Sequence, residues 1–387
     1  MPVRFSKRTA WDTGESTLAE AVRQVRSSGR SLIDLTLSNP TLCGFEYDSA
    51  AILGALTNPA AMTYDPDPRG LTSARRAVSQ YYADNNALVD PAQILLTTST
   101  SEAYSFLFRL LCDPGDEVLV AQPSYPLFDF LADLDDVNLK PYPLFYDYGW
   151  WIDFAELERR IGPRTRAVLL VHPNNPTGHA TGRAERERLE AICAEHGLAL
   201  IVDEVFLDYS LGEPVESFAT GPHPALTFVL SGLSKISALP QMKVGWLACQ
   251  GPGELVAEAF GRLEVIADTF LSMNAPAQHA LPTWLASRES IVPQIVARTQ
   301  TNLAALAAAG LEALPVQAGW SAVLRLPVVA EGRIDALVQE AGVIVHPGSF
   351  YALPGKNQIV VILIGPVTEF AEGVLRLARW CESNSLT

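Results

Sequence analysis

A lysine that follows an apolar run is the residue best suited to covalent chemistry in this sequence. The segment Ser231 to Lys235 (SGLSK) comes directly after the apolar run Thr227 to Leu230, and a second cation, Lys243, lies eight residues beyond Lys235. A desolvated lysine near another cation has a lowered pKa, so its neutral amine can attack an aldehyde. The small neighbours of Lys235 would let a flat ring approach. The pattern indicates a Schiff-base lysine, and a solvated surface lysine is the plain alternative.

Two further polar residues follow apolar runs. Asp203 ends the run Leu198 to Val202, and Asn175 lies in a proline-rich turn (HPNNPTG) after the run Ala167 to Val171. A carboxylate beside a pyridine nitrogen keeps that nitrogen protonated, which makes the ring an electron sink. An asparagine amide can donate to a phenolate oxygen. Alternatively, Asp203 caps a helix and the HPNNPTG segment is only a turn.

A run of hydroxyl residues, Ser99, Thr100 and Ser101, lies between a predicted strand and a helix that begins near Ala103. Hydroxyls and free backbone N–H groups at the N-terminus of a helix form an anion site, although the same residues suit an ordinary helix cap. Tyr125, in a Pro-Ser-Tyr-Pro segment, could stack on a flat ring or serve as a core aromatic.

The elements that would position these residues alternate between strands and helices. Short apolar runs without polar alternation are typical of strands buried on both faces. The predicted strands are Ile94 to Thr97, Glu117 to Ala121, Ala167 to Val171, Ala199 to Val202 and Thr227 to Leu230. Helical patterns such as Arg183 to Glu195 lie between several of them, which predicts an α/β fold with a mainly parallel sheet. Ligands of such sheets bind at the carboxyl ends of the strands, where the polar candidates lie.

The chain length predicts more than one domain. Its 387 residues exceed the roughly 250–300 residues that a single core usually serves. Beyond Pro276, a long Ala/Leu helix near 290–309 precedes strands near 322–326 and 359–364 and helices near 333–341 and 368–382. We predict a large ligand-binding domain over 48–275 and a smaller α+β domain formed by 1–47 and 276–387.

Composition and charge exclude several classes of partner. The net charge of −15 disfavours nucleic acids and anionic membranes. No stretch approaches the roughly 20 apolar residues of a membrane span, and Met1 to Glu20 lacks the apolar core of a secretion signal. The five cysteines are scattered without a C-x-x-C pair, which argues against a metal site and a disulfide framework. A cytoplasmic location is expected.

Taken in order, these residues resemble the fold-type I PLP-dependent enzymes, specifically the class I/II aminotransferase family, over nearly the whole chain. The resemblance implies pyridoxal 5'-phosphate (PLP) as the cofactor, Lys235 as its Schiff-base lysine and Asp203 as the partner of its ring nitrogen. The other cofactor-binding residues that it implies are Ser99, Thr100, Ser101 and Lys243 at the phosphate, Tyr125 over the ring and Asn175 at the ring oxygen. It also implies a homodimer with shared active sites, because Tyr64 is similar to the tyrosine that reaches the cofactor phosphate of the neighbouring subunit.

Two departures from the family pattern concern the cofactor. Phe206 stands where the family usually has a tyrosine that donates to the ring oxygen, so the phenolate would be less stabilised. Gly232 stands where a phosphate-binding serine is common, which leaves Ser231 or Ser234 to substitute for it.

A third departure concerns the substrate. In the family, a C-terminal strand carries an arginine that binds the substrate's α-carboxylate. The corresponding strand here, Ile359 to Ile364, contains no arginine, and Val360 holds the place. Either the substrate differs or another residue binds the carboxylate. The candidates are Arg325, on a neighbouring predicted strand, and Asn39, in a turn that approaches the site in this family.

The activity that the resemblance implies is transfer of an amino group from an amino acid to a 2-oxo acid by a two-stage exchange, with Lys235 shuttling a proton. The absent arginine keeps open a PLP-dependent lyase, decarboxylase or cyclase on the same fold. A PLP-fold regulatory domain is not expected, because the large domain begins within about 50 residues of Met1 and leaves no room for a DNA-binding domain.

Overall fold

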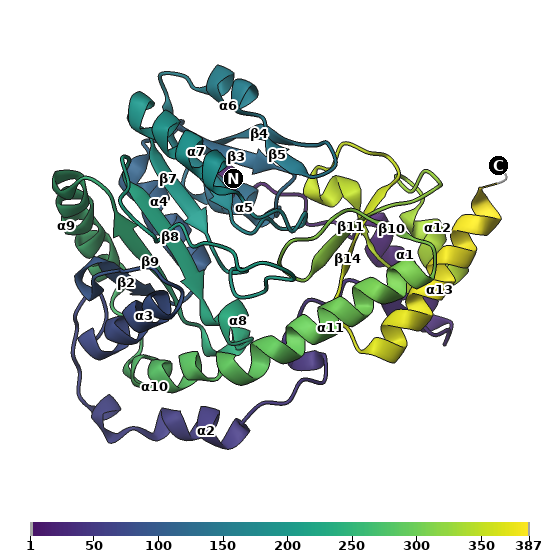
Figure 1. Ribbon diagram of the computed structural model, residues 1–387, viewed down its shortest axis with the longest axis horizontal. Helices are drawn as coiled ribbons and strands as arrows, with labels where there is room; N and C mark the ends of the chain where they lie inside the picture. The colour runs from purple at the N-terminus through teal and green to yellow at the C-terminus, as the bar shows by residue number, and fades with distance from the viewer. Residues whose placement is uncertain (1–2, 386–387) are drawn as a thin grey trace.

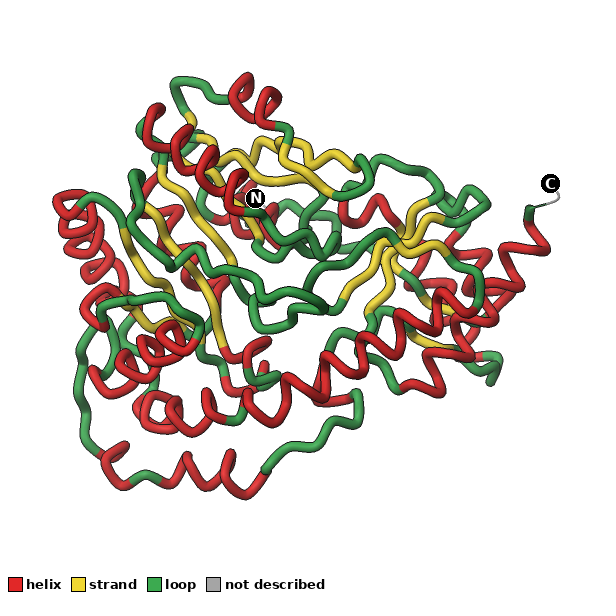
Figure 2. Tube along the Cα trace, viewed as in Figure 1, coloured by secondary structure: helices red, strands yellow, loops and turns green. Residues whose placement is uncertain are grey.

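A large sheet between two layers of helices dominates the computed structural model, which describes residues 3–385 (Figures 1 and 2). The sheet has eight strands in the spatial order β2-β9-β8-β7-β6-β3-β4-β5. In chain order these are β2 (Ile94–Thr97), β3 (Glu117–Gln122), β4 (Asn138–Tyr146), β5 (Trp150–Ile152), β6 (Thr165–Val171), β7 (Ala199–Asp203), β8 (Thr227–Gly232) and β9 (Gly245–Gln250). The five strands predicted from apolar runs are all present, within two residues of their expected ends.

The direction of the strands decides which loops meet. Strands β8, β7, β6, β3 and β4 are mutually parallel neighbours, whereas β9 is antiparallel to both β8 and β2, and β5 is antiparallel to β4. Because β2 and β8 are each antiparallel to β9, they run in the same direction. The carboxyl ends of β2, β6, β7 and β8 and the beginning of β9 therefore share one edge of the sheet.

Helices cover both faces of this sheet and bury two separate apolar cores. On one face the core is formed with α3 (Thr72–Asp84), α6 (Phe154–Arg160), α7 (Arg183–His196) and α10 (Ala275–Ala286). On the other face it is formed with α4 (Thr100–Leu111), α5 (Leu127–Leu134) and α9 (Gly253–Phe270). The central strands are buried on both faces, which is why they read as uninterrupted apolar runs.

The smaller domain has its own core around a four-stranded antiparallel sheet, in the order β10-β11-β14-β13. Its strands are β10 (Glu312–Ala313), β11 (Ser321–Arg325), β13 (His346–Pro347) and β14 (Gln358–Ile362). A separate parallel pair joins β1 (Ile33–Asp34) to β12 (Val343–Ile344). The helices are α1 (Thr17–Ser27), α11 (Arg288–Ala308), α12 (Ile334–Ala341) and α13 (Val367–Asn384). Helix α1 of the N-terminal segment packs on α12.

Helix α10 requires a correction to the predicted domain boundary near residue 276. Its residues Ala277, Ala280, Leu281 and Trp284 belong to the core of the large domain, and the Trp284 indole donates to the Ile52 carbonyl at 2.9 Å. The passage to the smaller domain therefore falls after α10, along α11, which runs between the two parts of the molecule (Figure 1).

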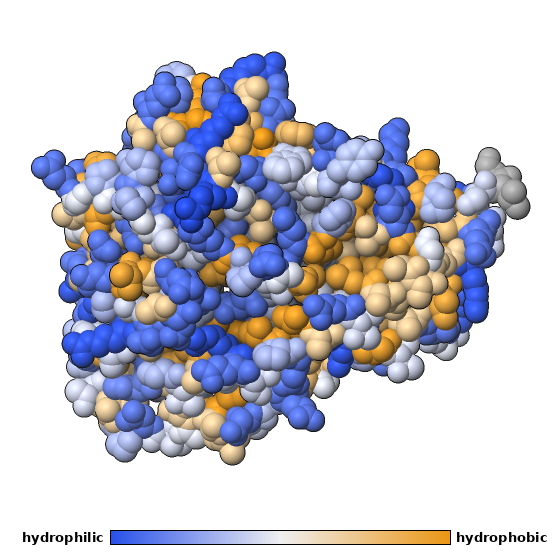
Figure 3. Space-filling model, in the orientation of Figure 1, coloured by the Kyte–Doolittle hydropathy of each residue, from blue (hydrophilic) through white to orange (hydrophobic). Residues whose placement is uncertain are grey.

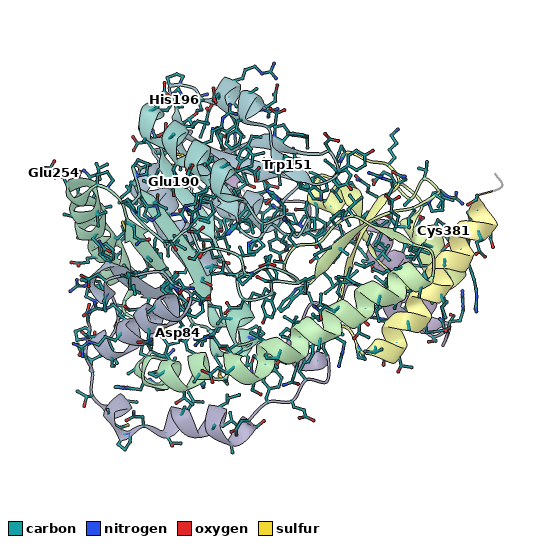
Figure 4. All side chains as sticks on the ribbon, in the orientation of Figure 1. Asp84, Trp151, Glu190, His196, Glu254 and Cys381 are labelled. Atoms are coloured by element: carbon teal, nitrogen blue, oxygen red, sulfur yellow. The ribbon has the colours of Figure 1, made fainter. Side chains whose placement is uncertain are left out.

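The surface shows no broad apolar face in the view of Figure 3: it is mostly hydrophilic, and apolar residues gather over the middle of the molecule and along α11. Among residues 3–385, no helix is long and apolar enough to cross a membrane. The five cysteines are free thiols, and Cys381 on α13 is far from the large sheet (Figure 4).

Candidate active site

Three candidate residues meet in one cavity of about 340 Å³ at the shared sheet edge. Asp203 is the last residue of β7, Asn175 lies in the turn after β6, and Lys235 lies on the single helical turn α8 (Leu233–Ile236) after β8. Because these strands are adjacent and parallel, their carboxyl ends place the three side chains on neighbouring walls. The smaller domain closes the other side of the cavity with residues of β11, β13 and β14.

The amine of Lys235 faces aromatic rings rather than a carboxylate. Its Nζ atom lies 5.0 Å from the centroid of the Trp320 ring and 5.7 Å from that of Phe206. Desolvation lowers the pKa of Lys235 to about 8, although the Asp203 charge opposes this shift. The Tyr209 hydroxyl donates to the Lys235 carbonyl at 2.5 Å, which fixes the helical turn that carries the amine. The neutral, nucleophilic amine is therefore a minor form of Lys235 at neutral pH, but far more of it is present than for an ordinary lysine with a pKa of 10.5.

The carboxylate of Asp203 is buried, with 6% of its surface exposed, and it has two donors. The Tyr104 hydroxyl donates to Oδ2 at 2.8 Å, and the backbone N–H of Val205 donates to Oδ1 at 3.1 Å. Desolvation raises the pKa of Asp203, whereas these two hydrogen bonds lower it. A buried carboxylate held by neutral donors is a strong acceptor for a cationic ring nitrogen.

Asn175 is oriented from the opposite domain. The hydroxyl of Ser321, the first residue of β11, donates to its side-chain oxygen at 3.4 Å, and both residues line the cavity. With the amide oxygen engaged in this way, the NH₂ group of Asn175 is the part that remains for a ligand.

The predicted anion site forms where α4 begins. The Ser99 hydroxyl caps the helix by accepting from the Glu102 N–H at 3.1 Å, while Thr100 and Ser101 line the cavity. The first N–H groups of a helix have no partner within it, so they can bind an anion. Gly245 at the start of β9 packs directly beneath this turn, because a Cβ there would lie 2.8 Å from the Ser99 carbonyl carbon.

The structure also explains the glycine at 232. A Cβ there would lie 2.8 Å from the Val244 carbonyl oxygen, so the close approach of β8 to the start of β9 leaves no room for serine. Of the two proposed substitutes, Ser234 lines the cavity, whereas the Ser231 hydroxyl is buried against the Glu204 carbonyl at 3.4 Å. Lys243 is exposed beside the beginning of β9 and does not line the cavity.

The aromatic candidates fall in different places. Tyr125 is 42% exposed and lines the cavity, as does the buried ring of Phe206, which packs edge-on against Trp320 at 5.1 Å. Tyr64 is 79% exposed and lies outside the cavity of its own subunit.

Arg325 is separated from the cavity, which corrects its assignment to the substrate carboxylate. It lies at the opposite end of β11 from Ser321, about 13 Å away at the rise of a strand. Its guanidinium pairs with Glu312 at 3.1 Å and lies over the Tyr146 ring. Asn39 also lies outside: its side chain accepts from the Thr41 N–H and hydroxyl, although the nearby Thr36 and Ser38 line the cavity.

Several cavity residues were not predicted from the sequence. Tyr104 was detectable, because it lies one helical turn after Thr100 and Ser101 and so shares their face of α4. Four cavity residues from the smaller domain had no such signal, because they meet the sheet edge only through tertiary packing. They are Trp320, His346, Phe350 and Tyr351.

Comparison with known proteins identifies the family. The family model of aminotransferase class I and II matches residues 50–363. The glutamate-pyruvate aminotransferase AlaA of Escherichia coli K12 is 30% identical over 289 residues, covering 74% of this chain and 71% of that protein. The corresponding Haemophilus influenzae protein is 26% identical and covers 93% of each chain.

Solved structures show the same fold. The alanine aminotransferase of Pyrococcus furiosus has a TM-score of 0.88 at 22% identity and covers 98% of this chain and all of its own. An aspartate aminotransferase of Thermus thermophilus has a TM-score of 0.84 at 23% identity and covers 98% of this chain and all of its own. The match to the family model over most of the chain, together with the identity to AlaA, shows that this protein belongs to the class I and II aminotransferases.

Proposed function

We propose that the cavity binds PLP and that the enzyme uses it to transfer the amino group of an amino acid to a 2-oxo acid. The observation that carries the proposal is the convergence of Lys235, with a pKa of about 8, and the buried Asp203 on one cavity beside the open N-terminus of α4. These residues suit an aldehyde, a cationic ring nitrogen and a phosphate, respectively. Asn175 would donate to the ring oxygen, and Tyr125 would cover the ring face.

The residues of this chain would then divide the work. When bound, PLP supplies an electron sink for the electron pair left at the substrate's Cα. Asp203 keeps the ring nitrogen protonated by charge-assisted hydrogen bonding. Lys235, as a free amine in an apolar environment, would take the proton from the substrate's Cα and deliver it to C4' of the cofactor. Trp320 and Phe206 exclude water from this amine.

The test is a half-reaction followed by absorbance. With an amino acid alone, a transaminase converts its bound cofactor to the amino form once and then stops until a 2-oxo acid is added. Continuous turnover on the amino acid alone would instead indicate a lyase, a decarboxylase or a cyclase. The relatives named above are all aminotransferases, which favours the first outcome.

A homodimer with shared sites is part of the proposal. Tyr64 is highly exposed, and the segment of chain just before it also carries exposed apolar side chains, Leu53, Leu56 and Met62. A second subunit would cover these groups, and Tyr64 would reach the anion site of that subunit.

A further inference from the structure

The cavity lacks the cation that would be expected to bind a substrate carboxylate. Among the described residues that line it, Lys235 and His346 are the only side chains that can carry a positive charge, and none is an arginine. Lys235 is assigned to the cofactor and to proton transfer. A carboxylate in a largely apolar cavity needs a charged or hydrogen-bonding partner to offset its desolvation. His346 is therefore the remaining side chain that can supply a charged partner.

The position of His346 is set by the small sheet. It lies on β13 directly opposite Val360 on β14, in antiparallel register. Side chains directly opposite each other on neighbouring strands project from the same face of the sheet, and so do residues two apart along a strand. Ile362, two residues after Val360, lines the cavity with His346. The imidazole thus projects on the same face as the position at which the family resemblance places an arginine.

The imidazole ring is fixed, but its nitrogens are unused. It stacks on Phe350 with ring centroids 5.0 Å apart and planes 5° from parallel, and Tyr351 meets it edge-on at 5.7 Å. Within the described part of the chain, neither ring nitrogen makes a hydrogen bond. A ring held rigidly at a cavity wall with free nitrogens is preorganised to donate to a ligand.

Two opposing effects act on the protonation of His346. Burial lowers the pKa of His346, and the Asp34 carboxylate opposes this shift. The Asp34 carboxylate is itself held by the backbone N–H and hydroxyl of Thr36, a cavity residue, at 2.8 and 2.5 Å. Tyr351, whose pKa burial raises to a value well above neutrality, faces the ring as a neutral group. The net effect favours the neutral imidazole, which still has one N–H to donate, and a bound carboxylate would add to the effect of Asp34 and favour protonation.

We propose that His346 binds the α-carboxylate of the amino-acid substrate and so determines the preference of this enzyme for amino acids over simple amines. This inference rests on the proposed transamination. A single imidazole N–H replaces the two-pronged contact of a guanidinium, so binding of the carboxylate is retained with weaker geometric selection.

The experiment compares matched amino donors in the half-reaction. L-alanine, L-glutamate and L-phenylalanine are each tested against the amine that lacks the α-carboxylate: ethylamine, 4-aminobutanoate and 2-phenylethylamine. His346→Phe keeps the stacking on Phe350 but removes both nitrogens, and His346→Gln keeps an N–H donor without the charge. Arg325→Ala is the control, because Arg325 is an exposed cation outside the cavity.

For the amino acids, His346→Phe should raise the donor concentration at half-maximal rate by about tenfold or more, and His346→Gln by less. The rate at saturating donor should change little, because the lost contact stabilises the bound substrate and the transition state equally. Ethylamine and 2-phenylethylamine should respond to neither change, which also shows that the variants are folded. Arg325→Ala should leave every donor unaffected.

Three results would overturn the inference. One is an equal response of acids and amines to His346→Phe, another is a response of the amino acids to Arg325→Ala instead, and the third is a wild-type preference for the carboxylate-free amines. In all three the cofactor is still converted to its amino form, so the proposed transamination stands. If no donor converts the cofactor, the proposed function fails together with this inference.

Discussion

The hydroxyl of Tyr104 donates to the carboxylate of Asp203 at 2.8 Å, and both side chains are buried. Burial raises the pKa of Asp203, and this hydrogen bond opposes the shift. Asp203 can keep a ring nitrogen protonated only while its own carboxyl group is ionised. Tyr104 is thus a positioning residue, because it acts on the cofactor only through Asp203.

The first prediction concerns this pair. Tyr104→Phe should keep PLP bound but slow the half-reaction about tenfold, because a hydrogen bond to a charged group contributes roughly 1.5–3 kcal/mol. Asp203→Asn should slow it further, since the ring nitrogen then loses its carboxylate. Stopped-flow absorbance with a saturating amino donor measures both rates. A half-reaction at the wild-type rate in Asp203→Asn would contradict the role of this carboxylate.

The second prediction concerns the attachment of the cofactor. Lys235→Ala should lose the covalent link to PLP and nearly all turnover, because no other lysine lines the cavity among the residues that the structure describes. Borohydride reduction followed by peptide mass spectrometry should find the cofactor on Lys235 in the wild type and on no residue in the variant. A reducible protein-bound PLP in Lys235→Ala would show that another amine carries the cofactor.

The parts of the fold that the sequence predicted are those in which local pattern and tertiary burial agree. Strand β7 is buried on both faces, so its uninterrupted apolar run was diagnostic. Strand β4 was missed because it contains Pro141 and Pro143, which cannot donate to a ladder and normally argue against a strand. Both prolines are tolerated because β5 pairs only with the end of β4, at Leu144 to Tyr146, and leaves the rest of that edge free.

The site divides in the same way into residues that the sequence predicted and residues that it did not. Asp203 ends a parallel strand, and Asn175 and Lys235 follow the two strands beside it, so the topology brings them together. Arg325 was chosen because it lies on a strand beside the one that lacks the family arginine, but strand periodicity does not show which end of β11 meets the cavity. His346 lies on a two-residue strand, which leaves no periodic signal at all.

The third prediction is the pH dependence of cofactor capture. Only the neutral amine of Lys235 attacks the aldehyde, so the rate at which the PLP-free protein captures PLP should rise with pH and level off above about 8, the pKa of Lys235. Asp203→Asn should move the midpoint to lower pH, because the Asp203 charge raises that pKa. A wild-type midpoint near the ordinary lysine value of 10.5 would show that desolvation does not act on this amine.

The last prediction concerns the partner subunit. If Tyr64 serves the anion site of the other subunit, Tyr64→Phe should weaken PLP binding in its own homodimer, because one hydrogen bond to the phosphate is lost. Lys235→Ala homodimers should be inactive. In a hybrid of the two variants, one site would combine the intact Lys235 of one chain with the intact Tyr64 of the other. Mixing the unfolded variants and refolding them together should therefore restore wild-type PLP affinity at one site per dimer.

The control is each variant refolded alone, which should restore nothing. If Tyr64 served its own site, no hybrid site would contain both residues, and activity at limiting PLP would not recover. Sedimentation of the wild type as a fully active monomer near 41.9 kDa would exclude shared sites altogether.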